Sequence, residues 1–221
     1  MVDSSTPPKI LYDTAFGALL KALQCLAEHP VIVTHPDHWQ TQFDSNETTT
    51  CVLDVALTIV YCNPAWDRFA LANNGEGAIA SRICGTPLFR YVPRVLEYHL
   101  SKLFERAREK REPVTADYEC NSPDVFRKFR MRISPIPSTS LLSVVHPLLA
   151  QCDIPYPAFR STDHNYGMGE FVTMCAQCRR TKRLHDNYWD WVPEFLRNPP
   201  ARVSCGICQE CLLLYCPDSK P

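Results

Sequence analysis

The sequence of 221 residues predicts an α+β fold, with an antiparallel sheet that has helices on one face. Runs of β-branched residues open and close the middle of the chain, at 51–62 and 114–145, and helical patterns lie between them. A third observation is a set of closely spaced cysteines near the carboxyl terminus, which predicts a separate small module. These observations divide the chain into an N-terminal tail with an amphipathic helix (1–48), a sheet domain (49–150), a linker (151–170) and a cysteine module (171–221).

The N-terminal segment predicts one amphipathic helix, from Lys9 to His29, which ends before Pro30. Its apolar side chains recur at intervals of three and four residues, at Tyr12, Phe16, Leu19, Leu23 and Leu26. This stripe can cover the core of the sheet domain, or it can pair with a second copy in a homodimer. Both alternatives stay open, and the homodimer is our partner prediction. Residues 41–50 are predicted to be a polar linker.

Two short strands and a capped helix begin the sheet domain. The predicted strands are Cys51–Val55 and Leu57–Cys62. Asn63 followed by Pro64 predicts a helix over 66–73, because asparagine is favoured as an N-cap and proline in the first turn.

A longer helix and three further strands complete this domain. The helix is predicted over Pro93–Arg111, with Leu96, Leu100, Leu103 and Ala107 on its apolar face. The strands are Val114–Cys120, Phe129–Ile133 and Leu141–Val145. The turn Asn121–Asp124 joins the first two of them.

The cysteine module contains the strongest chemical signal in the sequence. Cys175 and Cys178 form one Cys-x-x-Cys pair, and Cys208 and Cys211 form a second. Four thiolates at this spacing suit the tetrahedral shell of Zn²⁺. We therefore predict Zn²⁺ as the cofactor; the alternatives are an iron–sulfur cluster, mononuclear iron, disulfides and unrelated core cysteines.

Two further cysteines leave the second pair ambiguous. Cys205 and Cys208 also have Cys-x-x-Cys spacing, and Cys216 lies about one helical turn beyond Cys211. Either Cys205 with Cys208 or Cys208 with Cys211 could therefore complete the site.

The rest of the module predicts a short helix at Pro193–Arg197, a strand at Arg202–Ser204 and a terminal helix at Cys211–Cys216. A cysteine knuckle, followed by a helix and a second pair that opens a last helix, resembles a treble clef. A core of roughly fifty residues is small, so we expect metal binding to supply most of the stability of this module.

Several stretches resemble a known family. VLDVALTIVYCNPAWDRFA and YECNSPDVFRKFRMRISPI resemble the opening and closing parts of a PAS domain. MCAQCRR, YWDWVPEFL and VSCGICQEC resemble the cysteine-rich segment that some bacterial PAS-containing regulators carry. The first resemblance covers about 50–147 and the second about 172–213.

This resemblance implies a fold, a set of ligands and a class of function. The metal ligands that it implies are Cys175, Cys178, Cys208 and Cys211. Cys205 stands where the family has histidine, and Val55–Leu57 stands where it usually has Asp-Gly. A PAS-like domain would hold a ligand or a partner between its sheet and its middle helices. Haem-binding PAS sensors take an axial histidine from a middle helix, which is where this chain has His99.

The charge balance argues against a dedicated nucleic-acid binder. The formal net charge is −1, and 45% hydrophobic with 21% charged residues is typical of a globular protein. One local exception is the basic run, which we define as Arg179, Arg180, Lys182 and Arg183. We expect its side chains to be exposed, and to be paired with Asp186, Asp190 and Glu194.

The sequence also bears on the compartment. The segment 1–8 lacks the basic start and apolar core of a signal peptide, so we expect the 12 cysteines to be reduced and the protein to be cytoplasmic. No apolar run approaches the length of a membrane span.

Together these features predict a non-enzymatic regulatory protein, with a PAS-like sensory or interaction domain and a structural zinc module. Glu119 beside Cys120 and Asp163 beside His164 could form acid–base pairs, but such neighbours are usually solvated or capping groups. The alternative hypotheses are a zinc-dependent nucleic-acid binder and a haem or thiol redox sensor.

Overall fold

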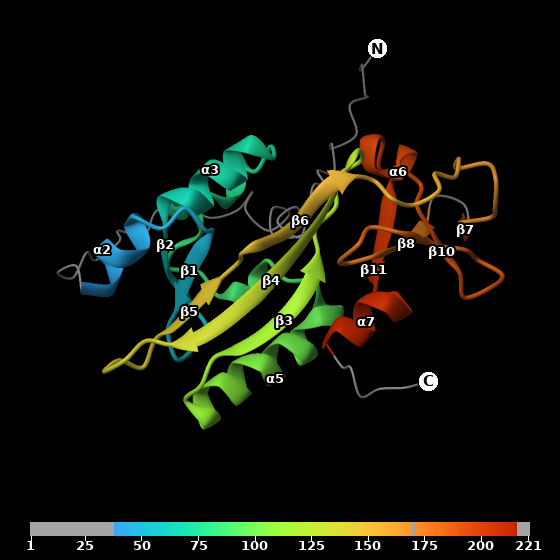
Figure 1. Cartoon of the computed structure of the whole chain (residues 1–221). Coiled ribbons are helices and arrows are strands. Elements are labelled where there is room, and N and C mark those ends of the chain that lie inside the picture. Colours follow the sequence, from blue (N-terminus) through green and yellow to red (C-terminus); the bar gives the residue numbers. More distant parts are fainter. Residues whose placement is uncertain (1–37, 169–170, 216–221) are drawn as a thin grey trace, which may run out of the picture.

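The computed structural model describes residues 38–168 and 171–215, which form two parts that follow one another along the chain (Figure 1). The sheet domain is built on a six-stranded sheet and the cysteine module on a five-stranded sheet. The predicted helix Lys9–His29 and Cys216 lie outside the described residues. Among the helices in the described part, none is long and apolar enough to cross a membrane.

The sheet of this domain begins with two strands, several helices follow, and further strands complete it, in the predicted order. Its elements are α2 (His38–Asp44), β1 (Thr50–Leu53), β2 (Ile59–Cys62), α3 (Pro64–Ala72), η2 (Glu76–Ala78), α4 (Ala80–Ile83), η3 (Leu88–Arg90), α5 (Arg94–Lys110), β3 (Val114–Glu119), β4 (Val125–Pro135), β5 (Leu142–Val145) and β6 (Leu148–Asp153). The strand order is β2-β1-β5-β4-β3, with β6 paired to the first half of β4. All these pairs are antiparallel, as predicted.

Helices cover one face of this sheet. Alternate residues of β3 and β4 point into a single buried core, as Tyr118 and Met131 do. The predicted apolar face of α5, from Leu96 to Ala107, is buried in the same core, which confirms the helical periodicity. Burying one leucine fully stabilises the fold by about 1.5–3 kcal/mol, so this face holds α5 on the sheet.

Asn63 fixes the start of α3, as predicted, and also ties that start to the preceding segment. Its side-chain oxygen accepts hydrogen bonds from the N–H groups of Trp66 and Thr50, both at 3.0 Å. Its side-chain amide donates to the carbonyl oxygens of Asn46 and Thr48 at 3.0 and 2.9 Å. The side chain is completely buried, so its polar atoms depend on these partners.

Asp54 and Leu57 determine the shape of the turn in the first hairpin. The carboxylate of Asp54 accepts hydrogen bonds from the N–H groups of Ala56 and Thr58, at 2.9 and 2.8 Å. Leu57 has a φ of 59°, a left-handed conformation that glycine adopts more readily. Asp54 therefore stabilises the turn Val55–Leu57 without the glycine that family members usually have there.

Two segments differ from the prediction. The sequence predicts a polar linker at 41–50, but α2 continues to Asp44, and its Trp39 and Phe43 rings contact Tyr61. The predicted linker 151–170 begins inside β6. All side chains of β6 are exposed, so the strand lacks the alternation by which strands are recognised, and its pairing with β4 defines it.

The cysteine module contains the predicted knuckle, strand and helices. Its elements are β7 (Gly167–Met168), β8 (Phe171–Cys175), β9 (Thr181–Lys182), β10 (Trp189–Asp190), α6 (Glu194–Arg197), β11 (Arg202–Gly206) and α7 (Gln209–Tyr215). The sheet order is β10-β9-β8-β11, and β11 runs parallel to β8. A knuckle after β8 and a second cysteine pair at the start of α7 give the expected treble-clef-like arrangement.

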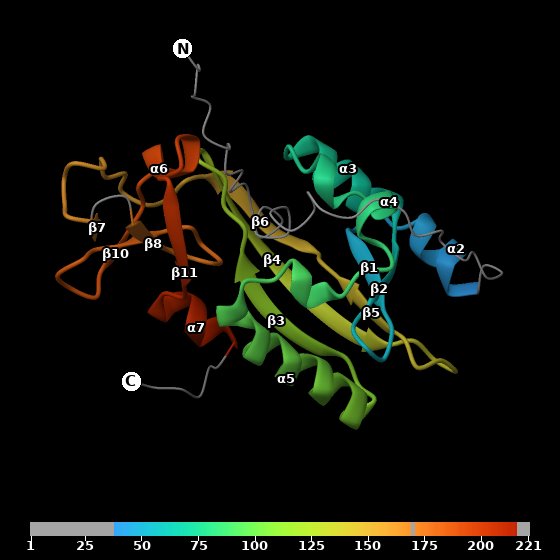
Figure 2. The ribbon, with the colours of Figure 1, turned by 180° about the vertical axis from the view of Figure 1, so that it is seen from behind.

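The two parts pack closely against one another. Figures 1 and 2 show the module at one end of the sheet, with α7 beside β3. Ala176, in the knuckle, is 1% exposed and belongs to the core of the sheet domain. Ile207 contacts both that core and the four buried cysteines. The sequence places a boundary and a linker between the two parts, but it gives no sign of this packing.

Candidate metal centre

Four cysteines from two distant segments meet at one point in the module. The sulfur atoms of Cys175, Cys178, Cys208 and Cys211 all lie within 4.8 Å of one another, and all four residues are 0% exposed. The Cys178 and Cys208 sulfurs are 3.6 Å apart. Zn–S bonds of about 2.3 Å in a tetrahedron require sulfurs about 3.8 Å apart, so this set fits a zinc ion.

Backbone pairing holds the two cysteine pairs in position. Cys175 ends β8, and the next residue, Ala176, donates its N–H to the carbonyl of Gly206 at the end of β11 (2.8 Å). Because β8 and β11 are parallel, both chains leave the sheet at the same end. The knuckle closes with Arg179 in the left-handed region (φ 67°), and its N–H donates to the Cys175 carbonyl at 3.2 Å.

Contacts within the cluster favour a thiolate at Cys175. The N–H of Cys208 donates to the Cys175 sulfur at 3.4 Å. Hydrogen bonds from the thiols of Cys178, Cys208 and Cys211 hold the pKa of Cys175 well below its ordinary value, and the hydrogen bonds to Cys175 raise the pKa of Cys178 and Cys211. A thiolate is the form that binds a metal ion, so metal binding would release the remaining thiol protons.

The structure also decides between the two pairs that the spacing left open. Cys205 is exposed on β11 and lies outside the cluster, whereas Cys208 and Cys211 lie within it. The structure thus brings together the four residues that the resemblance implied. The identity of the metal stays a prediction.

The basic run is not exposed as the sequence predicts, and this expectation is wrong. Arg179 is 2% exposed, and the side chain of Arg180 is 13% exposed. Arg180 lies 4.3 Å from the ring centre of Tyr156 and 3.2 Å from the carboxylate of Glu210. The module is small, so the side chains beside the knuckle pack against the few residues that surround it. This explains why Arg179 and Arg180 are buried although they are charged.

One of the predicted pairings in this run is strong. Arg183 donates to both carboxylate oxygens of Asp190, at 2.6 and 2.9 Å, and lies 3.6 Å from Asp186. Glu194 instead accepts a hydrogen bond from the N–H of Ser161 (2.9 Å). Arg180 and Arg183 are therefore engaged in contacts within the protein.

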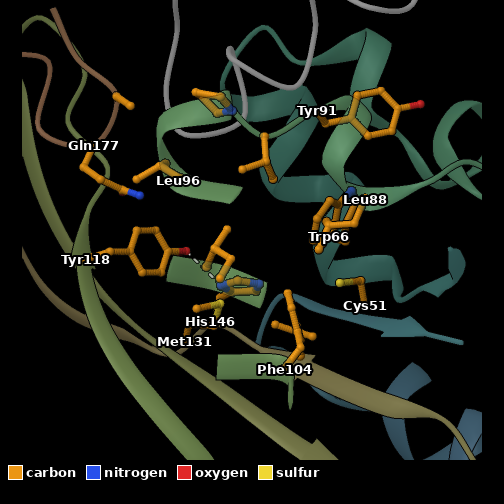
Figure 3. Close-up of a pocket in the computed structure, with 15 residues that line it drawn as sticks. Cys51, Trp66, Leu88, Tyr91, Leu96, Phe104, Tyr118, Met131, His146 and Gln177 are labelled. Atoms are coloured by element: carbon orange, nitrogen blue, oxygen red, sulfur yellow. Dashed lines mark hydrogen bonds between the residues drawn. The ribbon is translucent and has the colours of Figure 1, made fainter. Parts of the chain in front are cut away.

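A small cavity lies between the sheet, α5 and the knuckle (Figure 3). Its volume is about 100 Å³. It is lined by Cys51, Trp66, Leu88, Tyr91, Val92, Pro93, Leu96, Leu100, Phe104, Tyr118, Met131, Val144, His146, Ala176 and Gln177. None of these described lining residues is acidic, lysine or arginine, so the cavity suits an apolar occupant.

The histidine at this cavity is not the one that the sequence suggested. His99 lies on α5 but does not line the cavity, whereas His146, just after β5, does. The Nδ1 atom of His146 and the hydroxyl of Tyr118 form a 2.8 Å hydrogen bond. Burial lowers the pKa of His146 to about 4, so the imidazole is neutral at neutral pH.

Three other thiols bear on the redox alternative. Burial raises the pKa of Cys51 to about 12, as expected for a core cysteine. A hydrogen bond from Cys62 lowers the pKa of Cys84, which is only half-buried. The sequence alone does not reveal this contact, because Cys62 and Cys84 approach one another only in the folded chain.

The order of elements decides the fold of the sheet domain. Two strands, several helices and three strands form the sheet β2-β1-β5-β4-β3, with the helices on one face. This is the arrangement that the resemblance implied. The sheet domain has a PAS-like fold.

Solved structures similar to the PAS-like domain include domains of bacterial sensor proteins. The PAS domain of nitrogen regulation protein NR(II) from Vibrio parahaemolyticus is 18% identical, with a TM-score of 0.32, over 52% of this chain and 100% of that one. The PAS domain of Bordetella pertussis BvgS is 17% identical, with a TM-score of 0.39, over 52% and 83%. The photoactive yellow protein domain of the sensor histidine kinase Ppr from Rhodospirillum centenum is 16% identical, with a TM-score of 0.36, over 49% and 91%. The chain matches no family model, and no curated protein is similar to it.

Proposed function

We propose that this chain is a non-enzymatic signalling protein, in which a structural Zn²⁺ site holds the cysteine module against a PAS-like sensory or interaction domain. The observation that carries the proposal is the buried group of four cysteines whose knuckle is part of the PAS-like core. Four thiolates fill a tetrahedral shell and leave no position for a substrate, so the role of the metal is structural.

Metal binding would supply stability that the module cannot obtain from its own core. Its buried apolar residues fall into small separate groups, such as Tyr166, Val172 and Val192. A core of this size is marginal without disulfides or a metal ion. Zn²⁺ would therefore couple directly to the folding of this part of the chain.

The candidate acid–base groups have structural partners. The carboxylate of Glu119 accepts hydrogen bonds from Tyr156 (2.7 Å) and from Asn121 (2.9 Å). Asp163 accepts one from the N–H of Arg160 at 2.7 Å. These contacts support binding or signalling over catalysis for this chain.

Nucleic-acid binding is the less supported alternative. Phosphate recognition needs exposed cations, and Arg179 and Arg180 are largely buried while Arg183 is paired with Asp190.

We propose instead a cytoplasmic protein whose partner is a second copy or a small ligand. The homodimer would pair the stripe Tyr12–Leu26. Deletion of residues 1–30 should then convert a dimer to a monomer in sedimentation, and a monomeric full-length protein at tens of micromolar would contradict pairing.

Zinc stoichiometry of cysteine variants tests the metal site. Serine at position 175, 178, 208 or 211 should release the metal, because each substitution removes one of four thiolates. Cys205→Ser is the matched control, since Cys205 lies outside the cluster, and it should keep one zinc per chain. Metal retained in Cys211→Ser but lost in Cys205→Ser would overturn the assignment.

A further inference from the structure

We propose that the knuckle Cys175–Cys178 forms one wall of a small apolar binding site in the PAS-like domain, so that bound metal holds this wall of the site in place. This inference rests on the proposed function of the four cysteines as a zinc site. It adds a ligand class and a form of regulation that neither part of the chain would have alone.

The first step is that the knuckle contributes directly to the cavity. Ala176 and Gln177 line it together with side chains of α5 and of β3. Figure 3 shows Gln177 reaching from the module towards Leu96 and Tyr118. The two residues between the metal-binding cysteines are therefore the part of the module that faces the cavity.

The second step is that a rigid connection fixes the knuckle to the sheet. Asn121, which is 1% exposed and follows β3, donates its side-chain amide to the carbonyl of Cys178 at 3.2 Å. Its side-chain oxygen accepts from the N–H of Arg127 at 3.0 Å. Ile207, next to Cys208, packs on the same core. Bound metal would add bonds among the four cysteines to these contacts, so its loss would loosen the knuckle, and with it Ala176, against the core.

The third step concerns the chemistry of the ligand. A cavity of about 100 Å³ is smaller than the pockets of about 300–1,000 Å³ that hold drug-sized molecules. It is closer to apolar cavities of about 150 Å³ that stay dry and bind benzene or xenon. Tyr118 and His146 already bond to one another, so they need no polar ligand. The class that fits is a small uncharged apolar molecule, up to about one aromatic ring in size.

Ala176 is the smallest side chain of the knuckle, and it lines the cavity. A longer apolar side chain at this position should take up part of the cavity, because the surrounding core is close-packed. We therefore expect alanine here to help keep the cavity large enough for a ligand.

The test uses full-length protein, with xenon and benzene as probes and the ¹³C-methyl shifts of Leu96, Leu100 and Met131 as the signal. Zinc-loaded protein should show saturable shifts with both probes. After removal of zinc by a chelator, affinity should fall about tenfold or more, because the apparent Kd rises as the fraction of protein with the knuckle in place falls. Ala176→Leu should keep its zinc and lose both probes. Ala201→Leu, at an exposed position in the same module, is the matched control and should retain them.

The outcomes separate this inference from the proposed function. Zinc-loaded protein whose methyl shifts respond to neither probe would overturn the binding site and leave the zinc assignment intact. Equal affinity with and without zinc would overturn the coupling between metal and cavity. Protein that binds no zinc at all would overturn the proposed function itself. If Ala176→Leu does not fold, the chelation experiment decides, because it needs no substitution.

Discussion

At the scale of single residues, two buried asparagines connect segments that lie far apart in the sequence. The side chain of Asn63 makes hydrogen bonds with five residues around the start of α3, and Asn121 joins β3 to the knuckle. Each lies in a place that water does not reach. Losing one partner in such a place costs the desolvation of the group left behind, which is about 1–3 kcal/mol.

Asn63→Ala should destabilise the PAS-like domain by about 2 kcal/mol or more, because it removes a helix cap and leaves buried groups unpaired. The free energy of unfolding in urea measures this effect. Asn198→Ala, at an exposed position, is the control and should change the free energy by less than about 0.5 kcal/mol. Equal effects of the two substitutions would contradict the role of Asn63.

His146 gives a prediction about pH. Its folded pKa of about 4 lies below its ordinary value of 6.5, so the unfolded chain binds the proton more tightly. The neutral imidazole therefore contributes stability that is fully present above pH 6.5 and is lost as the pH falls towards 4. His146→Gln should lose less stability than the native protein over this window in thermal unfolding.

The matched control for this pH dependence is His185→Gln, since His185 is exposed. This variant should follow the native protein across the same window. A native slope unchanged by His146→Gln would show that His146 is protonated as easily in the folded protein as in the unfolded chain.

At the scale of elements, the sequence predicts those whose pattern is local. The repeat of Leu96, Leu100 and Leu103 predicts α5, and the Cys-x-x-Cys spacing predicts the knuckle. β6 could not be predicted, because its side chains are all exposed and only its pairing with β4 defines it. The burial of Ala176 could not be predicted either, because nothing in the sequence Cys-Ala-Gln-Cys shows that the knuckle packs into the core of the PAS-like domain.

The basic run shows the same limit at the candidate site. A row of arginines beside a knuckle predicts an exposed face, whereas Arg180 packs on Tyr156 and pairs with Glu210. Arg180→Ala should therefore destabilise the protein by about 1–2 kcal/mol, through the lost cation–π contact. Lys182→Ala, on the adjacent β9, should have little effect on the melting temperature. Similar melting temperatures for both variants would contradict a structural role for Arg180.

At the scale of the whole molecule, the two parts are connected through the knuckle. Removing the metal should therefore loosen more than the cysteine module. Amide hydrogen exchange in β3 (Val114–Glu119) should become faster after chelation, because Asn121 and Ala176 no longer cover that end of the sheet. Exchange in β1 (Thr50–Leu53) is the internal control and should change less, since Figure 1 places it at the far end of the sheet from the module. Unchanged exchange in β3 would show that the parts are independent.

The central claim is that one Zn²⁺ is bound by four buried cysteine sulfurs, and X-ray absorption at the zinc edge tests it most directly. The account predicts four sulfur neighbours at about 2.3 Å and no oxygen or nitrogen in the first shell. It also predicts one zinc per chain, with the same spectrum in Cys205→Ser as in the native protein. A shell with nitrogen or oxygen ligands, or an edge that belongs to iron, would contradict it.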